Sequence, residues 1–308
     1  MNQTYGLRRI SLLASALILA TVVACTPASR NDNDKPVVIA SFTVLADLTR
    51  MVTDDLASVR SLTAAGAEVE EWELTPSNFA DIERADLIFY NGYELETWIR
   101  QVQSTALDST PIVAVAEETG LPTLPIIIGE MQGNPDPHLW MDPRNAASYI
   151  TVIRDHLISI DPDNKQQYQD NAESAQQQLV QLYQNMTEAL RVIPQKQRRL
   201  ITTEAAFSYL TEALGFEHDG IWGINSEEEG TPQQMARIVD IVSALSIPAV
   251  FYESTTSPRH IQTVADETGV SVAGPLYIDS VDEPGSGADT YIGMQQRNVE
   301  LILQNLQE

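Results

Sequence analysis

Cysteine is almost absent from this sequence. The 308 residues contain one, Cys25, so no disulfide can form within a chain, and no further thiolate is left for metal binding or nucleophilic catalysis. Histidine is scarce too, with four residues, and Lys and Arg number 18 against 43 Asp and Glu, for a formal net charge of −25. A surface this acidic argues against nucleic acid or anionic lipid as a partner.

The N-terminus has the pattern of a targeting segment. Arg8 and Arg9 precede the apolar run Ile10–Val23, which is too short for a comfortable membrane span. The run closes on Val-Val-Ala-Cys25, which resembles the bacterial lipobox, so residues 1–24 are a predicted lipoprotein signal peptide and Cys25 the lipidated first mature residue. The alternative is a plain signal peptide with an incidental cysteine. Residues 25–35 then form a polar, lipid-anchored tether.

The rest of the chain alternates apolar, β-branched runs with helical patterns. Predicted strands are Val37–Phe42, Val59–Thr63, Ala85–Tyr90, Pro111–Val115, Arg199–Thr203, Pro248–Tyr252 and Val270–Leu276. Predicted helices are Thr43–Asp54, Pro76–Arg84, Leu95–Gln103, Ala146–Ile158, Ala205–Leu214, Gln233–Ala244, Pro258–Thr268 and Tyr291–Gln307. This alternation predicts an α/β fold of two lobes, residues 36–160 and 195–308, each a parallel sheet flanked by helices.

One long helix, residues 161–194, is predicted to join the lobes. Asp161 is a natural N-cap, Pro162 suits the first helical position, and Pro194 ends the pattern. At 1.5 Å per residue the helix would be roughly 45–50 Å long. No glycine occurs between Asn134 and Leu214, so we expect a rigid connector. An ordinary amphipathic helix within one domain is the alternative.

Ionisable side chains follow several predicted strands. Ligands in open α/β sheets bind beyond the carboxyl ends of strands. Candidates there are the acidic run Glu68–Glu73, His138 in the proline-rich loop Asn134–Asn145, Glu204 and Asp279. Each also has a plain structural explanation: a solvated acidic turn, a surface histidine, a charge in the first turn of a helix, or a turn cap.

The other three histidines are not assigned to metal. His156 lies in a predicted helix, His218 in a predicted acidic turn, and His260 at the start of a predicted helix.

From Val37 to the C-terminus the sequence resembles the metal-binding solute-receptor lipoproteins of bacterial ABC importers (cluster A-I), which capture manganese, zinc or iron(II). Similar segments are GAEVEEWELTPSN, ADLIFYNGYELETW, DPHLWMDPRNA, ITTEAAFSYLTEALGF, VFYESTTSPRHIQTVADETGV and PLYIDS with ADTYIGMQQRNVELI. The segment DPHLWMDP alone is specific for this family, and the other segments are specific only in combination.

The resemblance implies metal ligands at His138, Glu204 and Asp279. A glutamate at the third position is the form of the manganese and iron receptors, and the long His-rich loop of the zinc receptors is absent from Thr119–Gly133. The first position departs from the family, because Glu70 stands where histidine is usual. Glu70 is the predicted first ligand, with Glu68 or Glu71 as alternatives.

Ligand chemistry favours a hard ion. Carboxylate oxygens suit Mn²⁺, while raw affinity rises from Mn²⁺ toward Zn²⁺. One nitrogen and up to six carboxylate oxygens also exceed the four ligands of usual zinc sites. Mn²⁺ is therefore the predicted ion, with Fe²⁺ and Zn²⁺ as competitors. Asp136 is predicted to orient His138 through its second ring nitrogen.

The predicted function is a receptor, not an enzyme, that delivers the ion to an ABC permease. It would be a monomer outside the cytoplasm, periplasmic or on the cell surface, held to the membrane by Cys25. A metal-dependent secreted hydrolase is one alternative, but the sequence has no nucleophile elbow and no HExxH motif. An adhesin of the same fold with weakened metal binding is the other.

Overall fold

The computed structural model of the chain describes residues 35–224 and 230–307. The predicted signal peptide 1–24, Cys25 and all of the tether except Lys35 lie outside the described residues. Within the described ranges, no helix combines the length and apolar character required to cross a bilayer.

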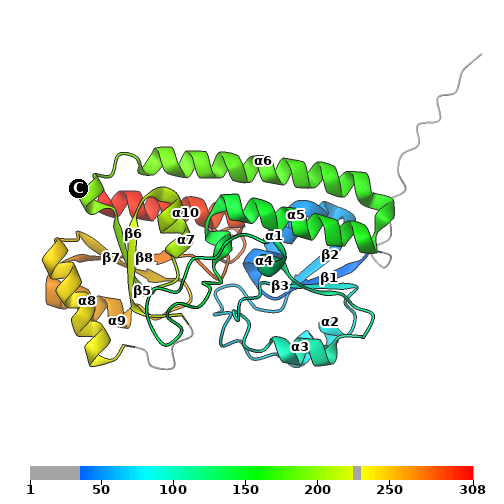
Figure 1. The fold of residues 1–308 in the computed structure, drawn as a ribbon, viewed down its shortest axis with the longest axis horizontal. Coiled ribbons are helices and arrows are strands. Elements are labelled where there is room, and N and C mark those ends of the chain that lie inside the picture. Colours follow the sequence, from blue (N-terminus) through cyan, green and yellow to red (C-terminus); the bar gives the residue numbers. More distant parts are fainter. Residues whose placement is uncertain (1–34, 225–229, 308) are drawn as a thin grey trace, which may run out of the picture. The chain divides into compact units, whose positions relative to one another are not determined.

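The N-terminal lobe is built on four parallel strands in the order β2-β1-β3-β4 (Figure 1). The strands are β1 (Val37–Ala40), β2 (Ser58–Ser61), β3 (Leu87–Tyr90) and β4 (Ile112–Ala114). Its helices are α1 (Thr43–Thr53), α2 (Pro76–Ile82), α3 (Ile99–Thr105), α4 (Val115–Glu118) and α5 (Pro143–Ile160). The central strands β1 and β3 are almost wholly buried, as a parallel sheet covered on both faces requires.

The C-terminal lobe repeats this design. Its strands are β5 (Arg199–Glu204), β6 (Glu217–Trp222), β7 (Ala249–Glu253) and β8 (Ser271–Leu276). Its helices are α7 (Ser208–Leu214), α8 (Pro232–Leu245), α9 (Arg259–Thr268) and α10 (Tyr291–Leu306). The pairs β5-β6 and β7-β8 are parallel, and β5 lies beside β7. The predicted fold class, two α/β lobes with parallel sheets flanked by helices, is confirmed.

The long helix α6 (Lys165–Leu190) packs on α5, α1, α10 and α7, and so touches both lobes (Figure 1). Its 26 residues correspond to about 39 Å at 1.5 Å per residue, less than predicted. The predicted start was wrong, because a 3₁₀ turn (Pro162–Asn164) precedes the helix. The Asp161 carboxylate caps no backbone N–H there; it accepts hydrogen bonds from the Asn164 and Tyr168 side chains.

Strand β6 was not predicted, and the placement of His218 in an acidic turn was wrong. His218 lies in β6, where its Nε2 is 2.9 Å from the Thr202 hydroxyl. Only Ile221 and Trp222 at the end of this strand are apolar, so no apolar run marked it. Gly220 lets β6 approach the end of β5, since a Cβ there would lie 2.6 Å from the Ala205 nitrogen.

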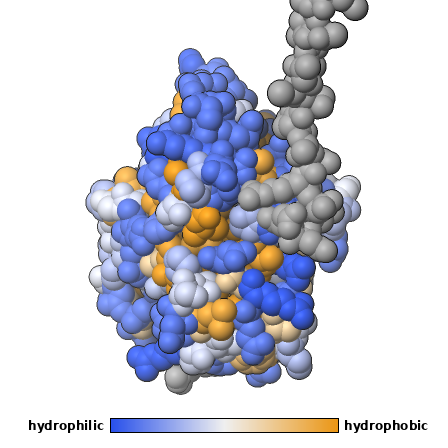
Figure 2. All heavy atoms as spheres, turned by 90° about the vertical axis from the view of Figure 1, so that its right-hand side faces the viewer, coloured by the Kyte–Doolittle hydropathy of each residue, from blue (hydrophilic) through white to orange (hydrophobic). Residues whose placement is uncertain are grey.

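One continuous apolar core extends from β1 through α5 and α6 to α10, and a smaller one lies between the C-terminal sheet and α8 and α9. The C-terminal helix α10 packs against α1 of the N-terminal lobe as well as against α6. The lobe boundaries 36–160, 161–194 and 195–308 stay predictions, because contacts group Lys35–Glu308 into one unit. Hydrophilic residues cover most of the face in Figure 2, with smaller apolar patches between them.

Candidate metal centre

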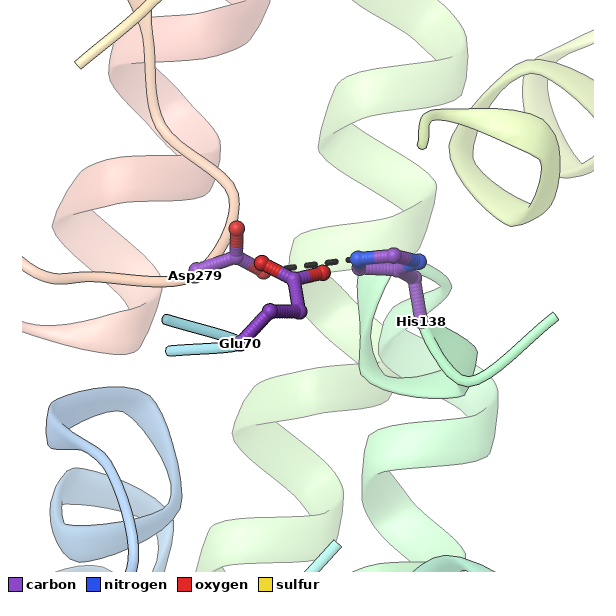
Figure 3. Close-up of side chains that lie close together, drawn as sticks. All are labelled: Glu70, His138 and Asp279. Atoms are coloured by element: carbon purple, nitrogen blue, oxygen red, sulfur yellow. Dashed lines mark ion pairs between the residues drawn. The ribbon is translucent and has the colours of Figure 1, made fainter. Parts of the chain in front are cut away.

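Three of the four predicted ligands converge. Glu70 comes from the loop between β2 and α2, His138 from the loop before α5, and Asp279 from the loop between β8 and α10. All three side chains are buried, and one ligand atom from each lies within 4.8 Å of the others. Figure 3 shows the two carboxylates and the imidazole turned toward one another.

The converging atoms have no hydrogen-bond partners among the described residues. These atoms are both carboxylate oxygens of Glu70, both of Asp279, and Nε2 of His138. Nε2 lies 3.4 Å from the nearer Asp279 oxygen. A buried polar atom without a partner costs about 1–3 kcal/mol, and native structures contain few. A cation between the three side chains would be a partner for at least one atom of each.

The His138 ring is held in one orientation, as predicted. The Asp136 carboxylate accepts a hydrogen bond from the His138 backbone N–H and lies 2.9 Å from Nδ1. Nδ1 therefore donates to Asp136, and the lone pair of Nε2 faces the cluster. The side chain is fully buried, which excludes the surface-histidine alternative.

The His138 loop is tied to both lobes. Asn91 of the N-terminal lobe donates to the Pro137 carbonyl at 2.9 Å. Tyr209 of the C-terminal lobe donates to the Asp136 carbonyl at 2.9 Å, and the Trp140 indole donates to the Ile278 carbonyl at 3.0 Å. The imidazole therefore stands on a loop fixed from two sides.

The Glu70 loop is anchored through its backbone. The Trp98 indole donates to the Val69 carbonyl at 2.7 Å, and the Thr97 hydroxyl donates to the Glu70 carbonyl at 2.6 Å. The alternatives to Glu70 are more exposed: Glu68 is half-buried and Glu71 is exposed, whereas Glu70 is 3% exposed. Burial therefore singles out Glu70 within the acidic run.

Glu204 lies near the cluster but outside the group of three. It is the last residue of β5 and is buried, so the first-turn explanation fails, because α7 begins only at Ser208. Burial raises its pKa well above the usual value, and the charges of Glu70 and Asp279 raise it further. Glu204 therefore stands within electrostatic reach of the other ligands.

The other groups of the cluster also titrate away from their usual values. Burial and the charge of Asp279 raise the pKa of Glu70 well above 4.5. Burial alone would lower the pKa of His138, but the hydrogen bond to Asp136 and the nearby carboxylates of Asp136 and Asp279 raise it well above 6.5. Because metal ligands must be deprotonated, an incoming cation would displace protons here.

The remaining histidines have structural partners. His156 in α5 pairs with Glu118 at 2.7 Å, and His260 in α9 packs edge-on against Trp222. Burial and the charge of His138 lower the pKa of His218 to about 3, so it is neutral. None of the three belongs to a metal-ligand group in the described part of the chain.

Three supporting residues were missed by sequence reasoning. Tyr209 holds the His138 loop, Ser280 accepts a hydrogen bond from the Gly66 N–H of the Glu70 loop at 2.7 Å, and Glu253 accepts from the Glu204 N–H at 3.2 Å. Glu253 follows the predicted strand Pro248–Tyr252 directly, so the rule that selected Glu204 could have found it. The sequence carried no comparable signal for Tyr209 or Ser280.

Two α/β lobes with a buried imidazole and carboxylate cluster at the carboxyl ends of their strands define a two-lobed metal-binding protein. A family described as ZnuA, zinc-uptake complex component A, periplasmic, matches residues 38–305. The manganese-binding lipoprotein MntA of Halalkalibacterium halodurans is 37% identical over 297 residues, 96% of this chain and 97% of that protein.

Two further comparisons agree. The iron-binding protein YfeA of Yersinia pestis is 35% identical over 96% of this chain and 95% of its own length. The Mn-bound periplasmic metal binding protein of Candidatus Liberibacter asiaticus superposes with a TM-score of 0.80 at 30% identity, covering 88% of this chain and all of that one. The chain belongs to the ZnuA family, the metal-binding receptors of bacterial ABC importers, and is not an enzyme.

Proposed function

We propose that this protein captures Mn²⁺ outside the cytoplasm and delivers it to an ABC permease. Glu70, His138, Glu204 and Asp279 are its proposed ligands. The observation that carries the proposal is that Glu70, His138 and Asp279 bring one buried ligand atom each to within 4.8 Å of the others, from side-chain atoms that have no hydrogen-bond partner in the described part of the chain.

The ion is proposed from the ligand atoms. One nitrogen and three carboxylates form a mostly oxygen set, which suits Mn²⁺ and Fe²⁺ better than the soft ligands that select copper or zinc. The relatives named for manganese and for iron support the same two ions. Because Zn²⁺ has the higher intrinsic affinity for such ligands, it would also bind in vitro. The concentration of each free ion around the protein would then decide which one it carries.

The test is metal content and affinity of the purified protein. We expect one equivalent of metal by mass spectrometry and a measurable affinity for Mn²⁺ by titration calorimetry. Glu70→Ala should abolish stoichiometric binding, while Glu68→Ala, its matched control in the same loop, should retain it. A wild-type protein without stoichiometric metal would contradict the proposal and favour the adhesin alternative.

Lipid anchoring at Cys25, the monomeric state and permease delivery belong to the same proposal. Relatives named as substrate-binding lipoproteins of metal ABC transporters support the lipid anchor and the permease partner. Labelling cells with a palmitate analogue should mark the wild type and not Cys25→Ala. Cells that lack the chain should accumulate less Mn²⁺ when it is limiting.

A further inference from the structure

Glu253 is a buried acid that the proposed ligand set does not use. It ends β7 and is 1% exposed. Its Oε1 accepts the backbone N–H of Thr203 at 3.0 Å and that of Glu204 at 3.2 Å. Its Oε2 accepts the Thr256 hydroxyl at 2.8 Å. One carboxylate therefore holds two successive amides at the end of the neighbouring strand.

These contacts lie where β5 and β7 run side by side. On the other edge of β5, the Ala205 N–H bonds to the Trp222 carbonyl of β6 at 3.0 Å, which is an ordinary backbone contact. On the β7 edge, the last two amides of β5 bond to a side chain. The direction in which β5 ends therefore depends on Glu253.

We propose that Glu253 is a positioning residue that sets how far the Glu204 carboxylate reaches toward the metal. Glu204 is the one proposed ligand outside the group of three, so a small shift of its backbone decides whether it coordinates the ion. Hydrogen bonds from amides to a carboxylate are among the stronger ones in proteins. This inference rests on the proposed function.

The experiment compares Mn²⁺ affinity in the full chain and its variants. Glu253→Ala removes both amide contacts, and we expect it to weaken Mn²⁺ binding about 10- to 100-fold, the usual effect of losing a group that supports a metal ligand. Glu253→Gln keeps an oxygen that can accept from both amides, so its affinity should stay near wild type. Thr256→Val, the matched control, removes the contact to Oε2 alone and should also bind normally.

A double-mutant cycle with Glu204→Ala separates positioning from general destabilisation. If Glu253 acts through Glu204, Glu253→Ala should have no further effect on affinity once Glu204 is alanine, whereas additive losses would overturn the inference. If Glu253→Ala does not fold, Glu253→Asp, one methylene shorter, takes its place in the cycle. Unchanged Mn²⁺ affinity in Glu253→Ala, or in Glu253→Asp where that variant replaces it, overturns the inference alone. A wild-type chain that binds no metal overturns the proposed function, and the inference with it.

Discussion

At the scale of single residues, position 70 determines the character of the proposed ligand set. Glu70 stands where the metal receptors that this sequence resembles usually have histidine. Its buried carboxylate faces Asp279 and His138. The set thereby gains a hard oxygen ligand and loses a nitrogen. The three carboxylates of Glu70, Glu204 and Asp279 leave a bound dication with a net charge of −1, so this site should discriminate among ions differently from one with two imidazoles.

Glu70→His should raise the preference for Zn²⁺ over Mn²⁺. Imidazole suits Zn²⁺ better than carboxylate does, and we expect the ratio of the two affinities to rise at least about tenfold, or about 1.4 kcal/mol. Competition titrations with a chelator of known affinity would measure both constants. Glu68→His, in the half-buried position nearby, serves as control. A ratio unchanged in Glu70→His would show that residue 70 does not contact the ion.

The stability of the metal-free protein should fall as pH rises from 6.5 to 8.5. Glu70, Glu204 and His138 have raised pKa values in the folded state. Each therefore contributes fully to folding stability at a pH below its usual pKa, and this contribution is lost as the pH rises through its raised pKa. Burial raises the pKa of Glu253 to about 7, so its contribution to stability is likewise lost as the pH rises through that value. His218 has a lowered pKa, so its contribution changes only below about 6.5.

For each proton that the folded state holds and the unfolded state does not, the free energy of unfolding falls by about 1.4 kcal/mol per pH unit. Urea unfolding of chelator-treated protein at pH 6.5, 7.5 and 8.5 would measure the slope. Mn²⁺ affinity should change in the opposite direction, because the ion competes with these protons. Stability that is flat or increasing with pH in the metal-free protein would contradict the assigned protonation.

At the scale of elements, two loops from opposite lobes are joined through Ser280. Its hydroxyl accepts the Gly66 N–H at 2.7 Å, donates to the Val281 carbonyl at 2.7 Å and lies 3.1 Å from the Thr43 hydroxyl. The loop that carries Asp279 is thereby bonded to the loop that carries Glu70. These bonds favour the arrangement in which the two carboxylates face one another.

Ser280→Ala should therefore speed the release of Mn²⁺. The variant leaves the Gly66 N–H without its acceptor, which we expect to cost about 1–3 kcal/mol of folding stability. The loop that carries Glu70 should therefore open more often. Stopped-flow mixing of loaded protein with a chelator would give the dissociation rate. Ser104→Ala, which changes an exposed serine of α3, is the matched control. Equal release rates in the two variants would exclude a role for this junction.

Sequence reasoning succeeded at this scale where burial leaves a pattern. The apolar runs of β1, β3 and β7 marked buried parallel strands, and the apolar stripe of α6 marked a long helix. Strand β6 was not predicted because its first four residues, Glu217–Gly220, contain no apolar run and are ordered by pairing with β5. The start of α6 was misplaced because Pro162–Asn164 form a 3₁₀ turn before it.

The candidate site was predictable in its members and not in its geometry. Strand ends gave the acidic run Glu68–Glu73, His138, Glu204 and Asp279 as candidates, and the family resemblance favoured Glu70 within that run. The loops and strand end that carry the candidates are held by contacts of Glu253, Ser280 and Tyr209 with residues far away in the sequence. No local pattern encodes those contacts.

At the scale of the whole molecule, the two lobes share an apolar core. The larger cluster runs from β1 to α10, and α10 and α6 touch elements of both lobes. Such sharing couples the folding of one lobe to the other. The proposed site, whose ligands come from both halves of the chain, is then part of the same cooperative unit.

Adding Mn²⁺ should raise the midpoint of one cooperative unfolding transition, and EDTA should reverse the shift. Free ion at 100 times its dissociation constant should stabilise the folded state by about 2.7 kcal/mol. Calorimetry with and without the chelator is the measurement. Two separate transitions, of which metal moves only one, would mean that the lobes unfold independently despite the common core.

The indole of Trp140 is fully buried, with its ring centre 5.1 Å from that of His138 and 4.9 Å from that of Phe42. Its emission originates next to the imidazole and responds to charge brought close to the ring. Capture and release of cargo can thus be followed in real time as a change in intrinsic fluorescence, without attaching a dye. Substituting phenylalanine at Trp72 and Trp222 would simplify the signal and keep Trp98, whose indole anchors the Glu70 loop.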